Sequence, residues 1–281
     1  MKNIAVIGAG TMGNGIAHVF AQKGFAVHLV DAQAAALAKA ITTITKNIDR
    51  QIAKGIVSEE EKQRMLQSIS CFESIELGVQ EADLVIEAAT ENSGIKKTIF
   101  AALDQYAPAH CILASNTSSI SIAELASATK RPQLVIGMHF MNPVPVMNLV
   151  EIINGAQTAK EVTETIVSLT KTIDKIPCVV KDFPGFIANR ILMPMINEAI
   201  YALSEGVSDA ATIDQIMKLG MAHPMGPLQL ADYIGLDVCE NILDIMQEGF
   251  NNTKYAPCPL LVKMVATGKL GIKTGEGFYK Y

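Results

Sequence analysis

Short apolar runs alternate with amphipathic stretches over the first two thirds of the chain. Runs of four to seven residues are typical of strands buried on both faces. The stretches between them carry apolar residues at three- and four-residue spacing, which is typical of helices. This alternation predicts an α/β fold with a doubly wound, mostly parallel sheet. The expected strands cover residues 4–7, 26–30, 84–89, 112–115, 134–138, 147–153 and 176–181.

The pattern changes at Asp182, where Pro184 and Gly185 mark a boundary. Beyond it the chain reads as helix almost throughout, so we expect a sheet domain over 1–183 and a smaller all-helical domain over 184–281. Pro194 should kink or locally unwind the first of these helices. Some of the helices have no clearly solvated face, which predicts a dimer interface. The expected helices cover residues 187–204, 209–219, 227–250 and 257–266.

A glycine-rich turn follows the first expected strand. Gly8, Gly10 and Gly13 have the G-x-G-x-x-G spacing, and a helical pattern begins there. In a dinucleotide site these glycines allow a tight turn, a close backbone approach to pyrophosphate, and close helix packing. The helix N-terminus attracts the phosphates. Asp31, eighteen residues after Gly13 at the end of the second strand, would accept from a ribose 2′-hydroxyl and repel a 2′-phosphate, which favours NAD over NADP.

Polar residues follow several of the expected strands. They are Asp31, the turn 87–92, the turn 116–119 and His139. Ligands of open α/β sheets bind outside the carboxyl ends of the strands, so we expect these groups at one rim.

Glu151 lies inside an apolar run, where a carboxylate is costly unless it is paired. His139, upstream across a turn that contains Asn142, Pro143 and Pro145, is an available partner. Such a pair would fix the imidazole tautomer and raise its basicity, as abstraction of a hydroxyl proton requires. A purely structural bridge is the alternative.

A long helix is expected over residues 34–54, and another begins at Ser58. Ser58 and Glu61 have the spacing of a capping box, which recurs at Ser121 and Glu124. In the helix before Ser58, a set of residues at three- and four-residue spacing shares one face. That face is either a phosphate-binding surface or a solvated polar face. Its members are Asn47, Arg50 and Lys54.

Composition narrows the class of protein. The chain has 281 residues, a net charge of −5 and 49% hydrophobic residues, which suits a globular protein and gives no reason to expect nucleic acid. Five scattered cysteines predict buried free thiols in a reducing compartment. We find no leader peptide, no apolar run of membrane-spanning length and no metal or serine-nucleophile motif. We therefore expect a cytoplasmic protein without a metal or membrane partner.

These residues give the chain a resemblance to the L-3-hydroxyacyl-CoA dehydrogenase family. Within it the chain is most similar to the bacterial enzymes for 3-hydroxybutyryl-CoA that stand alone without a hydratase domain. The resemblance extends from end to end. Its motifs are GAGTMGNGIA, VIEAATEN, ASNTSSISI, GMHFMNPVPVMNLVEII, DFPGFIANRIL, MGPLQLADYIGLD and KTGEGFYKY.

The resemblance implies a role for each matching residue. His139 corresponds to the general acid/base, Glu151 to the carboxylate that orients it, and Ser118 and Asn189 to the pair that holds the reacting oxygen. The implied NAD contacts are Gly8, Gly10, Thr11, Met12, Gly13, Asp31, Glu91, Lys96, Asn116, Ser118, Asn142 and Lys273. The implied acyl-CoA contacts are Asn47, Arg50, Lys54, Lys96 and Ser118.

The implied activity is NAD-dependent interconversion of (S)-3-hydroxyacyl-CoA and 3-ketoacyl-CoA, with short-chain 3-hydroxybutyryl-CoA and acetoacetyl-CoA as substrates. The resemblance also implies a homodimer through the helical domain and a place in fatty acid or butyrate and butanol metabolism. Two alternatives are a dehydrogenase of another 3-hydroxyacid, such as 3-hydroxyadipyl-CoA, and a non-catalytic NAD-binding or structural relative.

Overall fold

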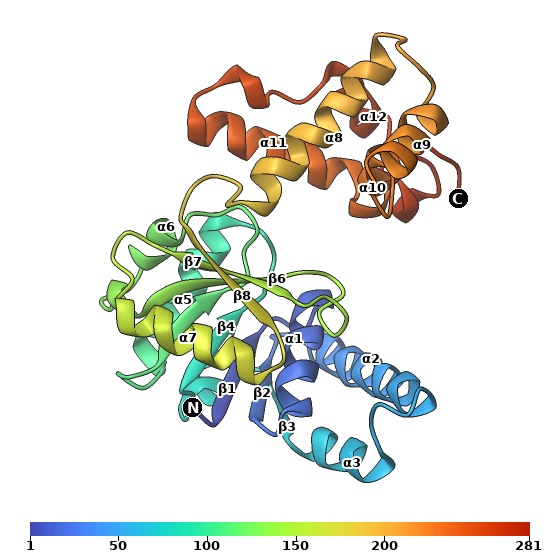
Figure 1. Ribbon diagram of the computed structural model, residues 1–281. Helices are drawn as coiled ribbons and strands as arrows, with labels where there is room; N and C mark the ends of the chain where they lie inside the picture. Colours follow the sequence, from blue (N-terminus) through green and yellow to red (C-terminus); the bar gives the residue numbers. More distant parts are fainter. The chain divides into compact units, whose positions relative to one another are not determined.

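The computed structural model describes residues 1–281 (Figure 1). The chain divides into two compact units, Met1–Asp182 and Phe183–Tyr281.

The first unit is built on one eight-stranded sheet with the strand order β3-β2-β1-β4-β5-β6-β7-β8 (Figure 1). Strands β1 to β6 are parallel, which confirms the expected Rossmann-type sheet, while β7 runs antiparallel to β6 and β8 runs parallel to β7. The link from β6 to β7 is too short for a parallel crossover, which needs about a dozen residues or more, so the chain reverses there. The strands are β1 (Asn3–Ile7), β2 (Ala26–Val30), β3 (Ile69–Phe72), β4 (Leu84–Glu87), β5 (Ile112–Ser115), β6 (Val135–Phe140), β7 (Leu149–Asn154) and β8 (Ile176–Lys181).

Several strand boundaries differ from expectation by one or two residues, as in β7, which covers Leu149–Asn154 instead of 147–153. Strand β4 ends at Glu87 instead of residue 89, and β6 continues through His139 to Phe140. Strand β3 was not expected from the hydrophobic pattern. It lies at the edge of the sheet and none of its residues is fully buried, so it lacks the continuous apolar run that marked the others.

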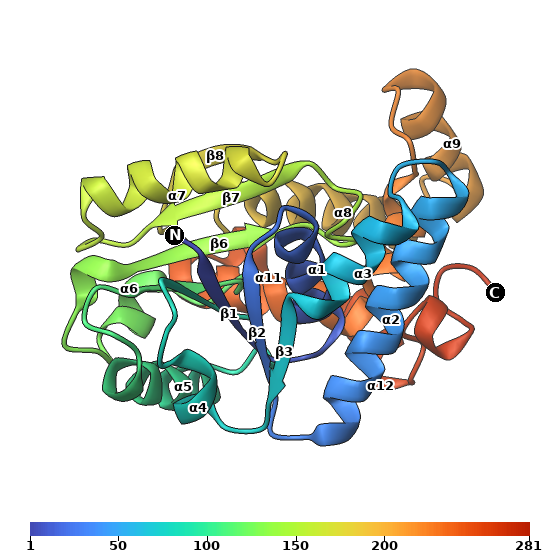
Figure 2. The same cartoon turned by 90° about the horizontal axis from the view of Figure 1, so that it is seen from below.

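Helices cover both faces of the sheet. Apolar residues of α1 and α7 belong to one core cluster, whereas α4, α5 and α6 lie on the other side of the strands (Figure 2). Short 3₁₀ turns are η1 (Pro132–Leu134) in this unit and η2 (Thr253–Tyr255) and η3 (Ile272–Thr274) in the second. The helices are α1 (Thr11–Gln22), α2 (Ala34–Ala53), α3 (Glu59–Gln67), α4 (Ile75–Val79), α5 (Ser93–Tyr106), α6 (Ile122–Ala126) and α7 (Lys160–Thr172).

One of the two expected capping boxes is complete. The Ser58 hydroxyl accepts from the Glu61 amide, and the Glu61 carboxylate accepts from the Ser58 amide. At α6 the Ser121 hydroxyl accepts from the Glu124 amide, but the Glu124 carboxylate pairs with Lys97 on α5 at 2.6 Å. The second box is therefore only half formed, because a lysine on the neighbouring helix competes for the carboxylate.

The second unit is helical, with its own apolar core. It contains α8 (Ala188–Ser204), α9 (Ala210–Gly220), α10 (Pro227–Ile234), α11 (Leu236–Phe250) and α12 (Pro259–Ala266). Helix α8 continues through Pro194, with Met193 and Ile196 buried on either side, so the prediction of local unwinding is wrong and a kink stays a prediction. A single helix over 227–250 is also wrong, because Gly235 adopts a φ of 106° and separates α10 from α11.

The cysteines only partly match expectation. All five are free, and Cys111, Cys239 and Cys258 are buried. Burial raises the pKa of Cys111 and of Cys239 to about 12. Cys71 and Cys178 are exposed, so the expectation of buried thiols is wrong for these two, which lie on the outer strands β3 and β8. No helix has both the length and the apolar composition required to cross a membrane.

Candidate active site

The glycine-rich turn between β1 and α1 has the geometry that its sequence predicts. Gly8 has a φ of +99°, which residues with a side chain rarely adopt. A Cβ added to Gly13 would lie 1.7 Å from the Gly8 carbonyl oxygen. Gly13 therefore allows α1 to pack directly against the turn, and no larger residue fits there.

The N-terminus of α1 is suited to an anionic ligand. Gly10 is its N-cap and provides no side-chain cap. The first backbone N–H groups of the helix are therefore available to donate hydrogen bonds to a ligand. A Cβ added to Gly10 would meet nothing within 4 Å, so the space beside the turn is open. An open, uncapped helix N-terminus fits the pyrophosphate of a dinucleotide.

Asp31 closes the turn from the neighbouring strand. Its carboxylate accepts from the Ala9 amide at 2.8 Å and from the Gln33 amide at 2.9 Å. Each carboxylate oxygen can accept more than one hydrogen bond, so both contacts leave acceptor capacity for a hydroxyl. Asp31 thus braces the glycine turn in addition to its predicted contact with ribose.

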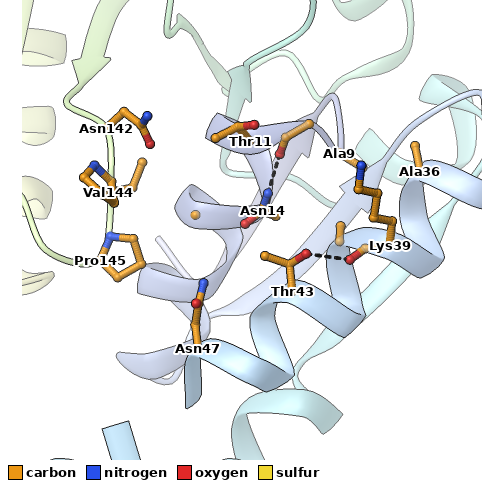
Figure 3. A pocket seen from close by; sticks show the side chains of 14 residues that line it. Ala9, Thr11, Asn14, Ala36, Lys39, Thr43, Asn47, Asn142, Val144 and Pro145 are labelled. Carbon is orange, nitrogen blue, oxygen red and sulfur yellow. Dashed lines mark hydrogen bonds between the residues drawn. The ribbon is translucent and has the colours of Figure 1, made fainter. Parts of the chain in front are cut away.

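A cavity of about 380 Å³ opens beside this turn. Figure 3 shows its lining, which comes from the start of α1, one face of α2 and the loop after β6. Four predicted ligand-binding residues meet there. They are Gly10, Thr11, Asn47 and Asn142.

A buried ion pair lies at the carboxyl end of β4. The Lys96 ammonium donates to Glu87 at 2.7 and 2.9 Å, and it lies 3.4 Å from the Glu91 carboxylate. Both Glu87 and Lys96 are at most 1% exposed. Ser115 on β5 also donates to Glu87, at 2.7 Å. In this structure Lys96 anchors two carboxylates, and its implied contacts with NAD and acyl-CoA stay predictions.

Glu91 organises the turn that follows β5. Its Oε1 accepts from Thr117 Oγ1 at 2.5 Å, from the Ser118 amide at 2.9 Å and from Ser119 Oγ at 2.9 Å. Burial acts to raise the pKa of Glu91, but the charge of Lys96 and these hydrogen bonds outweigh it and hold the pKa below its usual value. An ionised Glu91 therefore fixes the position of Ser118.

His139 and Glu151 form a pair across the β6–β7 hairpin. The two residues are opposite each other in the register, and His139 Nδ1 lies 2.7 Å from Glu151 Oε2. They are 8% and 2% exposed. A carboxylate accepts hydrogen bonds, so this contact places the ring hydrogen on Nδ1. The role of His139 as the acid/base stays a prediction.

Asn116 connects the turn after β5 to β6. Its Oδ1 accepts from the Phe140 amide at 2.9 Å, and Phe140 directly follows His139. The turn that carries Ser118 and the strand that carries His139 are thus held in a defined relation. The implied NAD contact of Asn116 remains a prediction.

The face of α2 is only partly gathered at the cavity. Asn47 lines it, and Arg50 Nη1 donates to Asn47 Oδ1 at 3.4 Å. Arg50 and Lys54 are exposed and do not belong to the lining. Their shared face continues beyond the cavity toward the C-terminal end of α2.

Asn189 and Lys273 belong to the second unit. Asn189 lies in the first turn of α8 and is 8% exposed. Lys273, in η3, forms an ion pair with Asp237 at the start of α11. The roles that the resemblance implies for these two residues stay predictions.

Two polar residues near the site carried no sequence signal that singled them out. Lys39 lies eight residues before Asn47 on the same helix, and Lys175 precedes β8. Lys175 donates at 2.7 Å to the carbonyls of Val144 and Met147. A hydrophobic-pattern search overlooks such residues, because the partners that make them informative are distant in sequence.

Comparison with known proteins gives one consistent result. Residues 3–183 match the family described as 3-hydroxyacyl-CoA dehydrogenase, NAD binding domain, and residues 185–281 match its C-terminal domain. The 3-hydroxybutyryl-CoA dehydrogenase of Bradyrhizobium diazoefficiens is 51% identical over 100% of this chain and 96% of that protein. The probable 3-hydroxybutyryl-CoA dehydrogenase of Bacillus subtilis is 49% identical over 100% of this chain and 98% of that protein.

A solved structure agrees with these sequence matches. The crystal structure of the (S)-3-hydroxybutyryl-CoA dehydrogenase of Ralstonia eutropha superposes with a TM-score of 0.97 at 46% identity, over 100% of this chain and 99% of that one. Both domains and the whole length are therefore accounted for by one family. The chain belongs to the 3-hydroxyacyl-CoA dehydrogenase family.

Proposed function

We propose that this protein is an NAD-dependent dehydrogenase that interconverts (S)-3-hydroxybutyryl-CoA and acetoacetyl-CoA. The observation that carries the proposal is the buried contact between His139 Nδ1 and Glu151 Oε2, in a chain whose first 183 residues match an NAD-binding domain. Relatives near 50% identity over the full chain bear the name of this activity.

Proton transfer is the part of the reaction assigned to His139. Its Nε2 would take the proton of the 3-hydroxyl group during oxidation and return it to the developing alkoxide during reduction. Glu151 would keep Nδ1 protonated and stabilise the imidazolium that forms. A positioned acid/base of this kind contributes about 10² to 10⁴ in rate.

The bound dinucleotide would supply the acceptor or donor of the hydride at C3. The residues proposed to hold it are the Gly8–Gly13 turn, Asp31, Glu91, Lys96, Asn116, Asn142 and Lys273. Asp31 supports NAD over NADP, because a carboxylate at this position repels a 2′-phosphate. Ser118 and Asn189 are proposed to donate hydrogen bonds to the reacting oxygen, which contributes roughly 3 kcal/mol for each such donor.

The remaining assignments complete the proposal. Residues 1–183 form the NAD-binding domain, and residues 184–281 provide Asn189, a wall for the substrate and the surface for homodimer formation. Asn47, Arg50 and Lys54 contact the CoA nucleotide. The cytoplasmic location remains a prediction.

An activity assay tests the proposal directly. Purified protein should oxidise NADH in the presence of acetoacetyl-CoA. It should oxidise NADPH more slowly with the same substrate, and it should oxidise NADH poorly with free acetoacetate. His139→Gln should lose about 10² to 10⁴ in kcat while NADH affinity is unchanged. His110→Gln is the matched control, because the His110 side chain is 68% exposed and should leave activity intact.

Three outcomes would contradict the proposal. Near-normal turnover by His139→Gln would remove His139 as the acid/base. Faster turnover of a 3-ketoadipyl-CoA or a free ketoacid would support another 3-hydroxyacid as the substrate. NADH binding without oxidation by any acyl-CoA would support the non-catalytic alternative.

A further inference from the structure

One charged side chain lines the cavity beside the glycine turn. Of the fourteen lining residues, eight are apolar or glycine and five are polar without a charge. Lys39 alone carries a charge. No carboxylate belongs to the lining. Lys39 is therefore the one charged group of the lining, and the nearby Asp31 carboxylate is held behind the turn by the Ala9 amide at 2.8 Å.

Lys39 enters the cavity from α2. Ala36, Lys39, Ala40, Thr43 and Asn47 line the cavity together and follow one another at three- and four-residue spacing, which places them on one face of the helix. Figure 3 shows the Lys39 side chain extending from α2 along this wall. Ala36 and Ala40, on either side of Lys39, have short side chains that do not cover it, so the ammonium group is accessible from the cavity.

The Lys39 ammonium is not used within the fold. Asp49, which lies on α2 like Lys39, forms an ion pair at 2.6 Å with Lys62 of α3. Lys39 forms an ion pair with no carboxylate of the chain. The neighbouring Thr43 hydroxyl is occupied, because it donates to the Lys39 carbonyl oxygen at 2.9 Å. Lys39 thus offers the cavity a cation whose attraction is not cancelled by an internal partner.

The opposite wall of the cavity is the start of α1. Gly10 and Thr11 line it, and the helix has no side-chain N-cap. Asn14 Nδ2 donates to the Gly10 carbonyl at 2.7 Å, which ties down the acceptor of the turn and leaves the N–H groups of the helix start for a ligand. An anion in the cavity would meet these donors on one side and Lys39 on the other.

We propose that Lys39 binds a phosphate group of the nucleotide that enters this cavity. The inference rests on the proposed function, and it adds a binding residue that neither the motifs nor the resemblance assigns. The group that Lys39 would bind is a pyrophosphate, which both the dinucleotide and CoA contain. The nearby start of α1 favours the pyrophosphate of the dinucleotide.

Lys39 also extends the predicted CoA face into the cavity. Lys39, Asn47, Arg50 and Lys54 continue along α2 over fifteen residues, or about 22 Å at the rise of an α-helix. The two ends of this stripe are cationic and Asn47 lies between them. A stripe of this length can contact phosphates of two different nucleotides, so the experiment must treat the two ligands separately.

Calorimetric titration of the full-length protein with NADH alone and with CoA alone tests the proposal. Lys39→Met removes the charge and keeps most of the aliphatic side chain. We expect it to weaken binding of NADH about tenfold or more, as the loss of one hydrogen bond to a charged group does. Lys39→Arg should retain affinity within about twofold, and raising the salt concentration should narrow the gap between wild type and Lys39→Met.

Lys46→Met is the matched control, because Lys46 is exposed on the same helix and does not line the cavity. Weaker binding of CoA instead of NADH would keep Lys39 as a phosphate ligand and change the source of the phosphate. Unchanged affinity for both ligands, or an equal loss in Lys46→Met, would overturn the proposal. A wild-type protein that binds neither NADH nor CoA would instead contradict the proposed function itself.

Discussion

The ammonium group of Lys175 donates a 2.7 Å hydrogen bond to the carbonyl oxygen of Val144. The same group donates to the Met147 carbonyl at 2.7 Å, and Lys175 is only 6% exposed. A Cβ added to Gly15 would lie 2.9 Å from Val144 Cβ, so α1 packs tightly against the other side of this loop. Lys175 and Gly15 together fix the position of the loop that carries Asn142 and lines one side of the cavity beside the glycine turn.

We predict that Lys175→Met weakens both stability and nucleotide binding. Two backbone carbonyls, of which that of Val144 is buried and that of Met147 is partly buried, lose their donor. This loss should lower the free energy of unfolding by about 2 kcal/mol, measured by urea denaturation. NADH affinity should fall as well, because Asn142, Val144 and Pro145 lose their fixed position. Lys171→Met, at an exposed position on α7, is the control. Equal NADH affinity in Lys175→Met and wild type would show that the loop holds its position without Lys175.

Asp31 should have two separable roles. Asp31→Asn keeps an acceptor for the Ala9 amide but removes the negative charge, so the ratio of kcat/KM for NADPH to that for NADH should rise about tenfold. Asp31→Ala also removes the brace on the glycine turn, and both cofactors should then bind more weakly. Steady-state kinetics with each cofactor distinguish the two variants. An unchanged cofactor ratio in Asp31→Asn would argue against a ribose contact.

The Glu87–Lys96 pair should be strongly coupled. Lys96→Met leaves the Glu87 carboxylate buried with its main counter-charge gone, which should cost about 3 to 5 kcal/mol of stability. Adding Glu87→Gln should restore part of that loss, because the unpaired charge is removed. A double-mutant cycle by urea denaturation measures the coupling. Additive effects of the two substitutions would contradict a direct interaction between the side chains.

His18 should make stability depend on pH. It is fully buried in α1, its Nε2 lies 3.1 Å from Gln51 Oε1, and its Nδ1 has no hydrogen-bond partner. Burial lowers the pKa of His18, with the hydrogen bond to Gln51 opposing and the charge of Lys175 adding to the shift.

The unfolded state therefore takes up a proton more readily, with a pKa of about 6.5. Stability from His18 is fully present above that pH and falls as the pH drops below it, by at most about 1.4 kcal/mol per pH unit. Urea midpoints at about pH 7.5 and pH 5.5 should differ more in wild type than in His18→Leu. An equal difference in both proteins would assign the pH dependence to other groups.

Much of the fold was predictable because its signals are local. Strands β2, β5 and β8 match the predicted runs residue for residue, since a continuous apolar run between turn signals has few alternatives. The misses have physical causes. Strand β3 is a half-exposed edge strand, and the break at Gly235 depends on a positive φ that an isolated glycine in a helical pattern does not reveal.

The glycine turn, Asp31 and the pairing of His139 with Glu151 were also predictable. The glycine spacing constrains the backbone within a few residues, and Glu151 in an apolar strand requires a partner. His139 was the nearest available group. The contact itself depends on the antiparallel register of β6 and β7, which a shift of one residue would destroy.

Local sequence signals establish which elements form and where a dinucleotide motif begins, because periodicity and glycine spacing act over short distances along the chain. Three relationships emerge only when the whole domain packs: Lys96 binds Glu87, Lys175 holds the loop of Val144, and Lys39 lines the same cavity as Gly10. These relationships join residues from different elements. Their energies depend on burial and on hydrogen-bond geometry, and both exist only after the sheet and its helices have packed.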